Sequence, residues 1–440
     1  MIASPVLTSR NTPRLLFTTI ARDIAALYSA IAADISASLE KEPALATADL
    51  SRQFEAFIAG PLRRHPIDRQ MVVVVDALDE AVCDDEDTDL LTILRDGITK
   101  LPLNFRLFLT SRPTRMIERF LSASGHVSSH LLDIDSSENR QDIAAYVDAM
   151  VQDVAISSQM EPSWPDEALI HDLKIMAEGL FIWIATVFAY LRSSHKPRAK
   201  LRALLSKSLV QGSLEPTKKI DALYAAILEI CGDWDDADFC GDYAIFMGAI
   251  MAVKRPLSLA ALRCLHGGDE ELSLDRLPQR FGSVLVGLHD EHEPIHTLHL
   301  SFREFVTARA AERVETQKFF LSEKEHSRQL AELCLRTIVR ELTAAPITGT
   351  GYLARDDDDG PGIPELTGVS EQLLYGCESW SDHVCDIDSP TVSVAEIMQE
   401  FLPHHSTTAI EIVASTSTFT GSLSVWRWLK VSVLLLQPRS

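Results

Sequence analysis

Three acidic residues follow a short hydrophobic run in the first quarter of the chain. Asp76 comes directly after Val72-Val73-Val74-Val75, and Asp79 and Glu80 lie three and four residues further on. A continuous β-branched run is typical of a strand that is buried on both faces of a parallel sheet. Ligands bind at the carboxyl edge of such sheets. There Asp76 could hold Mg²⁺, while an acid of the pair Asp79 and Glu80 could polarise a water towards a phosphate.

A cation follows the next strand-like run. Residues 105–109 lead directly into Thr110-Ser111-Arg112-Pro113. In a parallel sheet both runs would end at the same crevice, where the Arg112 guanidinium could bind a γ-phosphate. Taken alone, an arginine at a strand end would more simply form a surface ion pair. The succession of two such motifs, with a helical segment between them, favours a shared site.

Other interpretations of the acidic stretch are open. A buried strand that ends in an acidic surface loop needs no function, and the run Asp84 to Asp87 fits a solvated loop. A haloacid-dehalogenase-type phosphatase requires Asp-x-Asp, whereas two residues separate Asp76 from Asp79. A different metal-dependent phosphohydrolase is disfavoured, because no nucleophile motif and no His/Asp metal pattern surround Asp76.

The elements that would position these residues alternate between helix and strand. Apolar residues at helical spacing predict one continuous helix that begins after Thr12 and runs through Ile35, and a second helix over residues 50–62. Strands are predicted at 71–75 and 105–109, a helix at 89–100 between them, and a weaker third strand at 130–132. This order predicts an α/β layer with a parallel sheet over residues 1–150.

The remainder of the chain is predicted to be mainly helical. A helix that opens at Trp164-Pro165-Asp166-Glu167 continues by its apolar spacing to Leu191. A compact helical module follows, with β-like pieces at 283–288 and 295–300. A Gly/Pro/Asp-rich segment at 349–362 is typical of a linker, and a smaller helical tail comes after it.

Four segments in order carry a family resemblance. They read VVVVDALDE, FRLFLTSRP, GLFIWIATV and HTLHLSFREFV. From Ala3 to about Trp380 the chain resembles the NACHT modules of fungal STAND-class P-loop NTPases, also described as nephrocystin-like N-terminal domains. The resemblance implies a signalling switch that uses ATP or ADP with Mg²⁺, bound between an α/β core and a winged helix.

The resemblance also implies roles for individual residues. Asp76 would end the Walker B strand and serve Mg²⁺, and Asp79 and Glu80 would form the catalytic acidic pair. Arg112 would occupy the sensor-1 position, and His299 would be the winged-helix histidine that contacts nucleotide phosphates. Without the resemblance, a lone histidine beside aromatic residues is more simply a packing residue. Gly179-Leu180-Phe181 resembles a small-residue motif of the helical domain, although close helix packing explains that glycine equally well.

The same resemblance divides the chain into five parts. A partial, P-loop-NTPase-like α/β core at 1–150 would precede a helical domain at 151–215 and a winged-helix-like module at 216–345. An acidic Gly/Pro linker at 346–365 and a helical tail at 366–440 would complete it.

The phosphate-binding half of the expected site has no counterpart in this sequence. A P-loop has the pattern G-x-x-x-x-G-K-[ST], whereas the chain has no Gly-Lys dipeptide, and Gly60 is its only glycine before Asp76. Ile2 to Arg10 aligns with the second strand of the family, so the first strand is expected to be missing. This predicts defective ATP binding and no efficient catalysis, through a truncated gene model, degeneration, or a fragment that folds around the gap. The alternative is a non-catalytic pseudo-ATPase that serves as a protein-interaction module.

Composition restricts the partners. With 63 acidic and 41 basic residues, the net charge of −22 repels nucleic acid and anionic membranes. No apolar stretch reaches the ~20 residues that a membrane span needs. The seven cysteines include no C-x-x-C pair, which gives no sign of a zinc or dithiol site. We therefore expect a cytoplasmic protein whose partners are proteins or further copies of itself.

Overall fold

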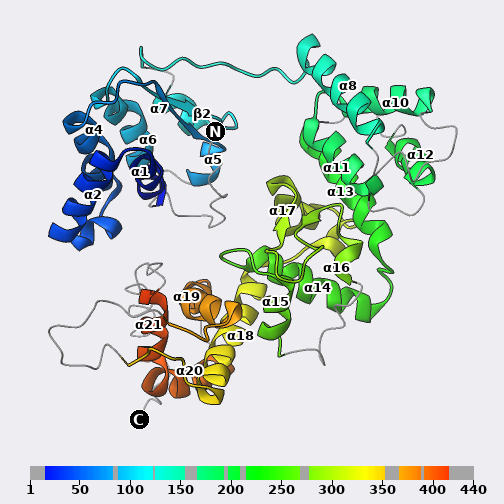
Figure 1. Cartoon of the computed structure of the whole chain (residues 1–440). Helices are drawn as coiled ribbons and strands as arrows, with labels where there is room; N and C mark the ends of the chain where they lie inside the picture. Colours follow the sequence, from blue (N-terminus) through cyan, green and yellow to red (C-terminus); the bar gives the residue numbers. More distant parts are fainter. Residues whose placement is uncertain are drawn as a thin grey trace. The chain divides into compact units, whose positions relative to one another are not determined.

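The chain forms two compact units, Met1–Leu132 and Asp133–Ser440, which are described separately (Figure 1). The computed structural model describes residues 15–82, 88–121, 124–153, 166–192, 197–208, 215–267, 277–351, 366–387 and 391–415. Over these ranges the protein is mostly helical, with one parallel and one antiparallel two-stranded sheet. No helix in these ranges is long and apolar enough to cross a membrane.

The first unit opens with two helices, α1 (Leu16–Leu27) and α2 (Ser29–Lys41). The prediction of one continuous helix is wrong at Tyr28, whose backbone is extended with φ −134° and ψ 101°. The apolar stripe continues across this break, and both helices bury their apolar side chains in the same core. Apolar spacing therefore could not reveal the break. The predicted start after Thr12 lies outside the described residues.

A second helical run covers residues 50–64. It consists of α3 (Leu50–Phe54), the π-helical turn η3 (Glu55–Ala59) and α4 (Gly60–Arg64), and it follows the short 3-10 helix η2 (Pro43–Thr47). The side chain of Asp49 caps α3 by accepting a hydrogen bond from the backbone N–H of Arg52 at 2.9 Å. The run continues past Pro61 because this residue lies in the first turn after the π-helical turn, where a missing N–H is tolerated.

The parallel sheet forms where the sequence predicts it. β1 (Met71–Val75) pairs with β2 (Phe105–Leu109) in register from Met71 opposite Phe105 to Val75 opposite Leu109. Between the strands lie α5 (Leu78–Ala81), α6 (Thr88–Thr92), the π-helical turn η4 (Ile93–Gly97) and η5 (Ile98–Lys100), and α7 (Arg115–Leu121) follows β2. The predicted helix at 89–100 is thus confirmed as a helical run.

Two expectations about this sheet are wrong. β1 alternates between half-buried and exposed residues, and Val72, Val74 and Phe108 remain 59%, 61% and 57% exposed. Core residues of the first unit therefore meet one face of the sheet, and a run of valines cannot show which face is covered. Residues 130–132 form no strand; Leu131 and Leu132 are 84% and 89% exposed. An apolar pair becomes a strand only where a neighbouring strand satisfies its backbone groups.

The second unit begins with a group of helices. They are α8 (Ser137–Val151), α10 (Glu167–Ala177), α11 (Phe181–Arg192), α12 (Pro197–Ser208) and α13 (Pro216–Cys231). The predicted helix from Trp164 to Leu191 is interrupted between α10 and α11, where Glu178 and Gly179 both adopt left-handed conformations with φ 45° and 79°. Trp164 and Pro165 lie outside the described residues.

The next elements include the second sheet. α14 (Ala237–Ala252), α15 (Leu259–Leu265) and α16 (Leu277–Arg280) precede the antiparallel pair β3 (Leu285–Val286) and β4 (His296–Thr297). α17 (Leu300–Thr307) and the 3-10 helices η6 (Arg309–Glu312) and η7 (Gln317–Phe319) follow. The β-like pieces predicted at 283–288 and 295–300 are confirmed as this short pair. Trp183, Tyr224 and Phe302 are among the fully buried side chains of the core that joins these elements to α8, α10, α11, α12 and α13.

The longest helix among the described residues, α18 (Glu323–Ala344), contributes to two cores. Leu330 and Cys334 face the core described above, whereas Leu335 and Ile338 face a smaller core. That smaller core is shared with α19 (Glu371–Cys385), α20 (Val392–His404) and α21 (Ser406–Ser415). α19 and α20 pack against α18, and α21 packs against α19 and α20 (Figure 1). The described part of the tail is therefore helical, as predicted. Most of the expected linker and the residues after 415 lie outside the described residues.

Candidate functional site

Thr110 organises the carboxyl edge of the parallel sheet. Its backbone N–H donates to the carbonyl of Val75 at 3.0 Å, which extends the strand pairing by one residue. Its hydroxyl donates to the Asp76 carboxylate and accepts from the backbone N–H of Ala77 at 2.9 Å. Its carbonyl accepts from the backbone N–H of Leu78 at 2.8 Å. The chain that leaves β1 is thus wrapped around one residue at the end of β2.

The turn after Asp76 depends on an uncommon backbone conformation. The backbone of Ala77 is left-handed, with φ 52° and ψ 53°. This conformation is unfavourable for residues that have a side chain. Leu78 then enters the core of the first unit and is 1% exposed. The two hydrogen bonds from Ala77 and Leu78 to Thr110 stabilise this conformation. Strained backbone of this kind often occurs at functional sites.

Asp79 holds the segment that follows β2. Its carboxylate accepts from the backbone N–H of Arg112 at 2.9 Å. The Ser111 hydroxyl donates to the carbonyl of Arg112 at 2.8 Å and lies 3.4 Å from the same carboxylate. The Arg112 guanidinium nitrogen Nε lies 3.5 Å from Asp79 Oδ2. The Asp79 side chain is 10% exposed, whereas that of Arg112 is 51% exposed. The largely buried Asp79 carboxylate therefore holds the Ser111–Arg112 segment in place. The Arg112 guanidinium forms an ion pair and is also accessible to solvent.

The register of the sheet brings three of the five predicted site residues to one edge. Asp76 follows β1, Asp79 lies in α5, and Arg112 comes three residues after β2, as the parallel arrangement predicts. Glu80 also belongs to α5, but its side chain is outside the described residues. Sequence reasoning gave Thr110 no role, although its place at the end of β2, opposite Asp76, was visible.

We call the carboxyl edge of β1 and β2, with Asp76 and Asp79, the acidic edge. It suits a magnesium ion that is also held by phosphate oxygens. Asp76 is exposed, and Asp79 is already engaged by the Ser111–Arg112 segment. Among the residues that the structure describes, no three His, Cys, Asp or Glu side chains form a metal-binding group. Magnesium usually keeps several waters and takes one or two carboxylates plus substrate phosphates. Asp76 could provide such a ligand, and it would not form a protein-only cage.

His299 lies in the second unit and caps a helix. Its Nδ1 accepts from the backbone N–H of Ser301 at 3.1 Å, at the start of α17. The Ser301 hydroxyl lies 2.8 Å from this nitrogen and 2.8 Å from the hydroxyl of Tyr224 in α13. Because Nδ1 accepts a backbone hydrogen bond, the neutral ring carries its proton on Nε2. Burial raises the pKa of Tyr224 to about 12, which keeps that hydroxyl protonated.

Arg309 supports the same region from η6. Its guanidinium forms a bidentate ion pair with Asp221 at 2.8 to 3.0 Å. It also reaches Glu304 at 3.0 Å and the carbonyl of Ser301 at 3.0 Å. Sequence reasoning missed this group, since nothing in the spacing of residues 221, 304 and 309 links them before the fold is known.

The structure gives Gly179 a role in close packing, one of the two interpretations of its motif. A Cβ atom at this position would lie 2.0 Å from the carbonyl oxygen of Ile134, and the backbone has φ +79°. The carbonyl of Gly179 accepts from the Asn139 side chain at 2.8 Å. The glycine therefore allows the start of α11 to approach the segment before α8.

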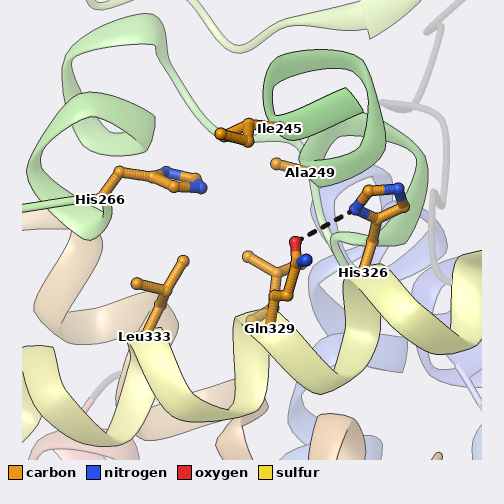
Figure 2. A pocket seen from close by; sticks show the side chains of 7 residues that line it. Ile245, Ala249, His266, His326, Gln329 and Leu333 are labelled. Atoms are coloured by element: carbon orange, nitrogen blue, oxygen red, sulfur yellow. Dashed lines mark hydrogen bonds between the residues drawn. The ribbon is translucent and has the colours of Figure 1, made fainter. Parts of the chain in front are cut away.

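A pocket beside α18 contains two histidines but is small. It has essentially no room for a water molecule between its lining residues, which are Ile245, Ala249, His266, His326, Gln329, Leu330 and Leu333 (Figure 2). His326 Nδ1 is hydrogen-bonded to Gln329 Oε1 at 3.3 Å, and His266 Nδ1 to the carbonyl of Leu262 at 2.9 Å. Pockets for drug-sized ligands occupy about 300–1,000 Å³. A nucleotide would not fit here.

A known protein family matches the part of the chain that forms the parallel sheet and the acidic edge. Residues 7–112 match the family model described as nephrocystin 3, N-terminal. Over these residues the chain is similar to nephrocystin 3 N-terminal domains. This segment includes α1, both strands of the parallel sheet, Asp76, Asp79 and Arg112. The resemblance to nephrocystin-like N-terminal domains that the sequence motifs indicated is confirmed.

The similarity extends beyond the nephrocystin 3 N-terminal segment. Over 353 residues the chain is 25% identical to the vegetative incompatibility protein HET-E-1 of Podospora anserina, a NACHT-domain protein. The match covers 74% of this chain and 23% of that relative, so the chain spans about a quarter of its length. No solved structure matches the chain.

Proposed function

We propose that this chain is the core of a NACHT-type, nucleotide-dependent signalling switch or scaffold that binds ATP weakly or not at all by itself. The carboxyl edge of β1 and β2 carries this proposal, because it gathers Asp76, Asp79 and Arg112 on adjacent strand ends. The distant similarity to HET-E-1 supports the same assignment. In this interpretation the first unit is a partial P-loop-NTPase-like core.

The second unit would supply the winged-helix part of the switch. The β3–β4 pair is followed directly by α17, and His299 stands at the helix start with Nε2–H as its donor. By the family resemblance, this imidazole would be the group that contacts a phosphate oxygen. Opening and closing of the nucleotide site would then control assembly with protein partners or further copies of the chain, in the cytoplasm.

The acidic edge would act in two steps. Asp76 would serve a magnesium ion bound to nucleotide phosphates, where the metal neutralises phosphate charge. Arg112 is held close to Asp79 and half exposed, so its guanidinium could turn from this carboxylate to a phosphate. Asp79 would keep the backbone of Arg112 in place throughout, through the 2.9 Å hydrogen bond from its N–H. Asp79 thus positions the cation, and Glu80 is the remaining candidate for polarising a water.

Direct binding measurements test this function. The purified chain is titrated with a fluorescent ATP analogue in the presence and absence of Mg²⁺, and the same titration is made with Asp76→Ala and Arg112→Ala. We expect weak affinity that depends on Mg²⁺ and falls about tenfold or more in each variant. Arg115→Ala, which changes an exposed arginine in α7, is the matched control and should bind as the original chain does. Measurable binding that is equal in all four proteins would refute the proposed site.

A non-catalytic interaction module is the second candidate. It is favoured by the Asp79–Arg112 pair, in which the two charges already neutralise each other, and by the absence of a Gly-Lys dipeptide from the 440 residues. Analytical ultracentrifugation with and without Mg-ATP separates the candidates. A sedimentation change that requires Mg-ATP and Asp76 supports the switch, whereas assembly that ignores both supports the module.

A further inference from the structure

A hydrogen-bonded circuit joins α14, α18 and α19 in the second unit. Its members are Lys254, which follows α14, Ser327 in α18, Tyr375 and His383 in α19, and Asp386 at the end of α19. The side chains of Tyr375 and His383 are fully buried, and Ser327 is 2% exposed. None of these residues belongs to the acidic edge or to the surroundings of His299.

The carboxylate of Asp386 determines which group donates in each of these hydrogen bonds. Asp386 can only accept, so the Ser327 hydroxyl donates to it at 2.5 Å and must itself accept from His383 Nδ1 at 2.7 Å. The neutral ring then accepts through Nε2 from the Tyr375 hydroxyl at 2.7 Å. Tyr375 in turn accepts from the backbone N–H of Lys254 at 3.1 Å, and the Lys254 ammonium closes the circuit on Asp386 at 2.6 Å.

Protonation of His383 is incompatible with this arrangement. A proton on Nε2 would point at the Tyr375 hydroxyl hydrogen and force that hydroxyl to turn away. It would also place a buried positive charge near the Lys254 ammonium. Burial, followed by the charge of Lys254, lowers the pKa of His383 from 6.5 to about 3. The intact circuit therefore requires a neutral imidazole.

Other titratable groups surround the circuit. Asp382 in α19 lies near Lys254 and Asp386, and burial raises its pKa. The Arg255 guanidinium lies over the Tyr375 ring, 5.4 Å from its centroid. The charges of Arg255 and Cys334 act on the Tyr375 hydroxyl, whose pKa burial raises far above its ordinary value. His326, the neighbour of Ser327 in α18, also has a pKa lowered by burial.

Further polar contacts join α19 to residues 254–258. Besides the circuit, Arg255 forms an ion pair with Glu378 at 2.8 Å. The backbone N–H of Ser258 donates to Glu371 at 3.0 Å, and its hydroxyl donates to the same carboxylate at 2.5 Å. By contrast, α18, α19, α20 and α21 share an apolar core. Separation of α19 from residues 254–258 would thus break these polar contacts, together with the packing of Tyr375 in the core that contains Leu257.

We propose that Lys254, Ser327, Tyr375, His383 and Asp386 form an acid-sensitive latch, which holds α19 against residues 254–258 and opens when His383 takes up a proton. The closed latch excludes the proton, whereas an opened imidazole accepts it with an ordinary affinity. Opening therefore becomes more favourable as pH falls below 6.5. Between pH 7.5 and 5.5, one such histidine increases the opening equilibrium about tenfold.

Amide hydrogen exchange of the full chain tests the latch. Exchange is measured at pH 7.5 and 5.5 and corrected for the intrinsic pH dependence of exchange. The backbone N–H of Lys254, which donates to Tyr375, and that of Ser258, which donates to Glu371, report opening. We expect their corrected exchange to rise about tenfold in the original chain. The amides of α17 in the same unit should not change.

Two histidine variants form a matched pair for this experiment. His383→Gln removes the titrating ring of the latch and should abolish the tenfold rise, whereas His326→Gln removes a neighbouring buried ring and should leave it intact. The same rise in His383→Gln would assign it to Asp382 or another group and overturn the proposal. An equal rise in α17 would mean that the whole unit unfolds, which also contradicts a local latch.

A third variant tests the circuit if His383→Gln does not fold. Tyr375→Phe keeps the buried ring and removes only the hydroxyl. It should speed exchange of the Lys254 amide at pH 7.5, because this N–H loses its acceptor. Unchanged exchange at this amide would show that the hydrogen bond to Tyr375 does not protect it, and the latch would be rejected.

Discussion

At the scale of single residues, one hydroxyl serves two partners at the edge of the parallel sheet. Thr110 donates to Asp76 and accepts from the N–H of Ala77. In Thr110→Val the branched shape remains, while both hydrogen bonds are lost. We expect the first unit to lose about 1–3 kcal/mol of unfolding free energy, since a bond to a charged acceptor is lost and an amide is left without its partner.

Denaturant unfolding followed by far-UV circular dichroism measures this loss. Thr110→Ser, which keeps the hydroxyl, should retain most of the stability. A valine variant as stable as the serine variant would show that the hydroxyl does not hold the turn after β1.

Two substitutions of His299 separate its role as the cap of α17 from its proposed role as a hydrogen-bond donor to a phosphate. The ring accepts from the backbone N–H of Ser301 through Nδ1. Asparagine is a strong N-cap residue, so His299→Asn should keep the stability of the second unit, while His299→Ala should lose about 1 kcal/mol. If Nε2–H also contacts a phosphate, both variants should bind the ATP analogue equally weakly.

Tryptophan fluorescence during urea unfolding, combined with the binding titration, distinguishes these roles. Nucleotide affinity that falls only in the alanine variant would mean that the histidine acts through the helix cap alone.

At the scale of elements, the break between α10 and α11 depends on one glycine. Gly179→Ala would place a Cβ atom against the carbonyl of Ile134 at a backbone φ of +79°. We expect a loss of more than about 2 kcal/mol, because the left-handed conformation alone costs roughly 1–2 kcal/mol. Gly241, in α14, has nothing within 4 Å of its built Cβ. Gly241→Ala should therefore stabilise the chain by about 0.5–1 kcal/mol.

Thermal unfolding of the two alanine variants gives the comparison. Changes of the same sign would contradict the assigned roles of these glycines.

The elements also show what the sequence could and could not predict. The strands at 71–75 and 105–109, and the edge that joins Asp76 to Arg112, follow from a β-branched run, polar strand ends and the parallel rule. The break at Tyr28 could not be predicted, because the apolar stripe continues through it. The exposed face of β1 depends on which neighbours the sheet acquires. The latch around His383 joins residues up to 132 positions apart, beyond the reach of any local pattern.

At the scale of the whole molecule, the cores of the two units share no residue. The core around Phe57 belongs to Met1–Leu132, and the core around Phe302 belongs to Asp133–Ser440. All six tryptophans come after residue 132. Tryptophan fluorescence therefore reports the second unit, while circular dichroism reports the helices of both.

Two buried phenylalanines test whether the units unfold independently. Phe57 and Phe302 are 2% and 0% exposed, and replacing either by alanine should cost its unit about 3–5 kcal/mol. We expect Phe57→Ala to shift the circular dichroism transition and to leave the fluorescence transition in place, whereas Phe302→Ala should shift both signals. If Phe57→Ala moves the fluorescence midpoint as far as Phe302→Ala does, the two units unfold as one cooperative body, and a change at the acidic edge would be felt throughout the chain.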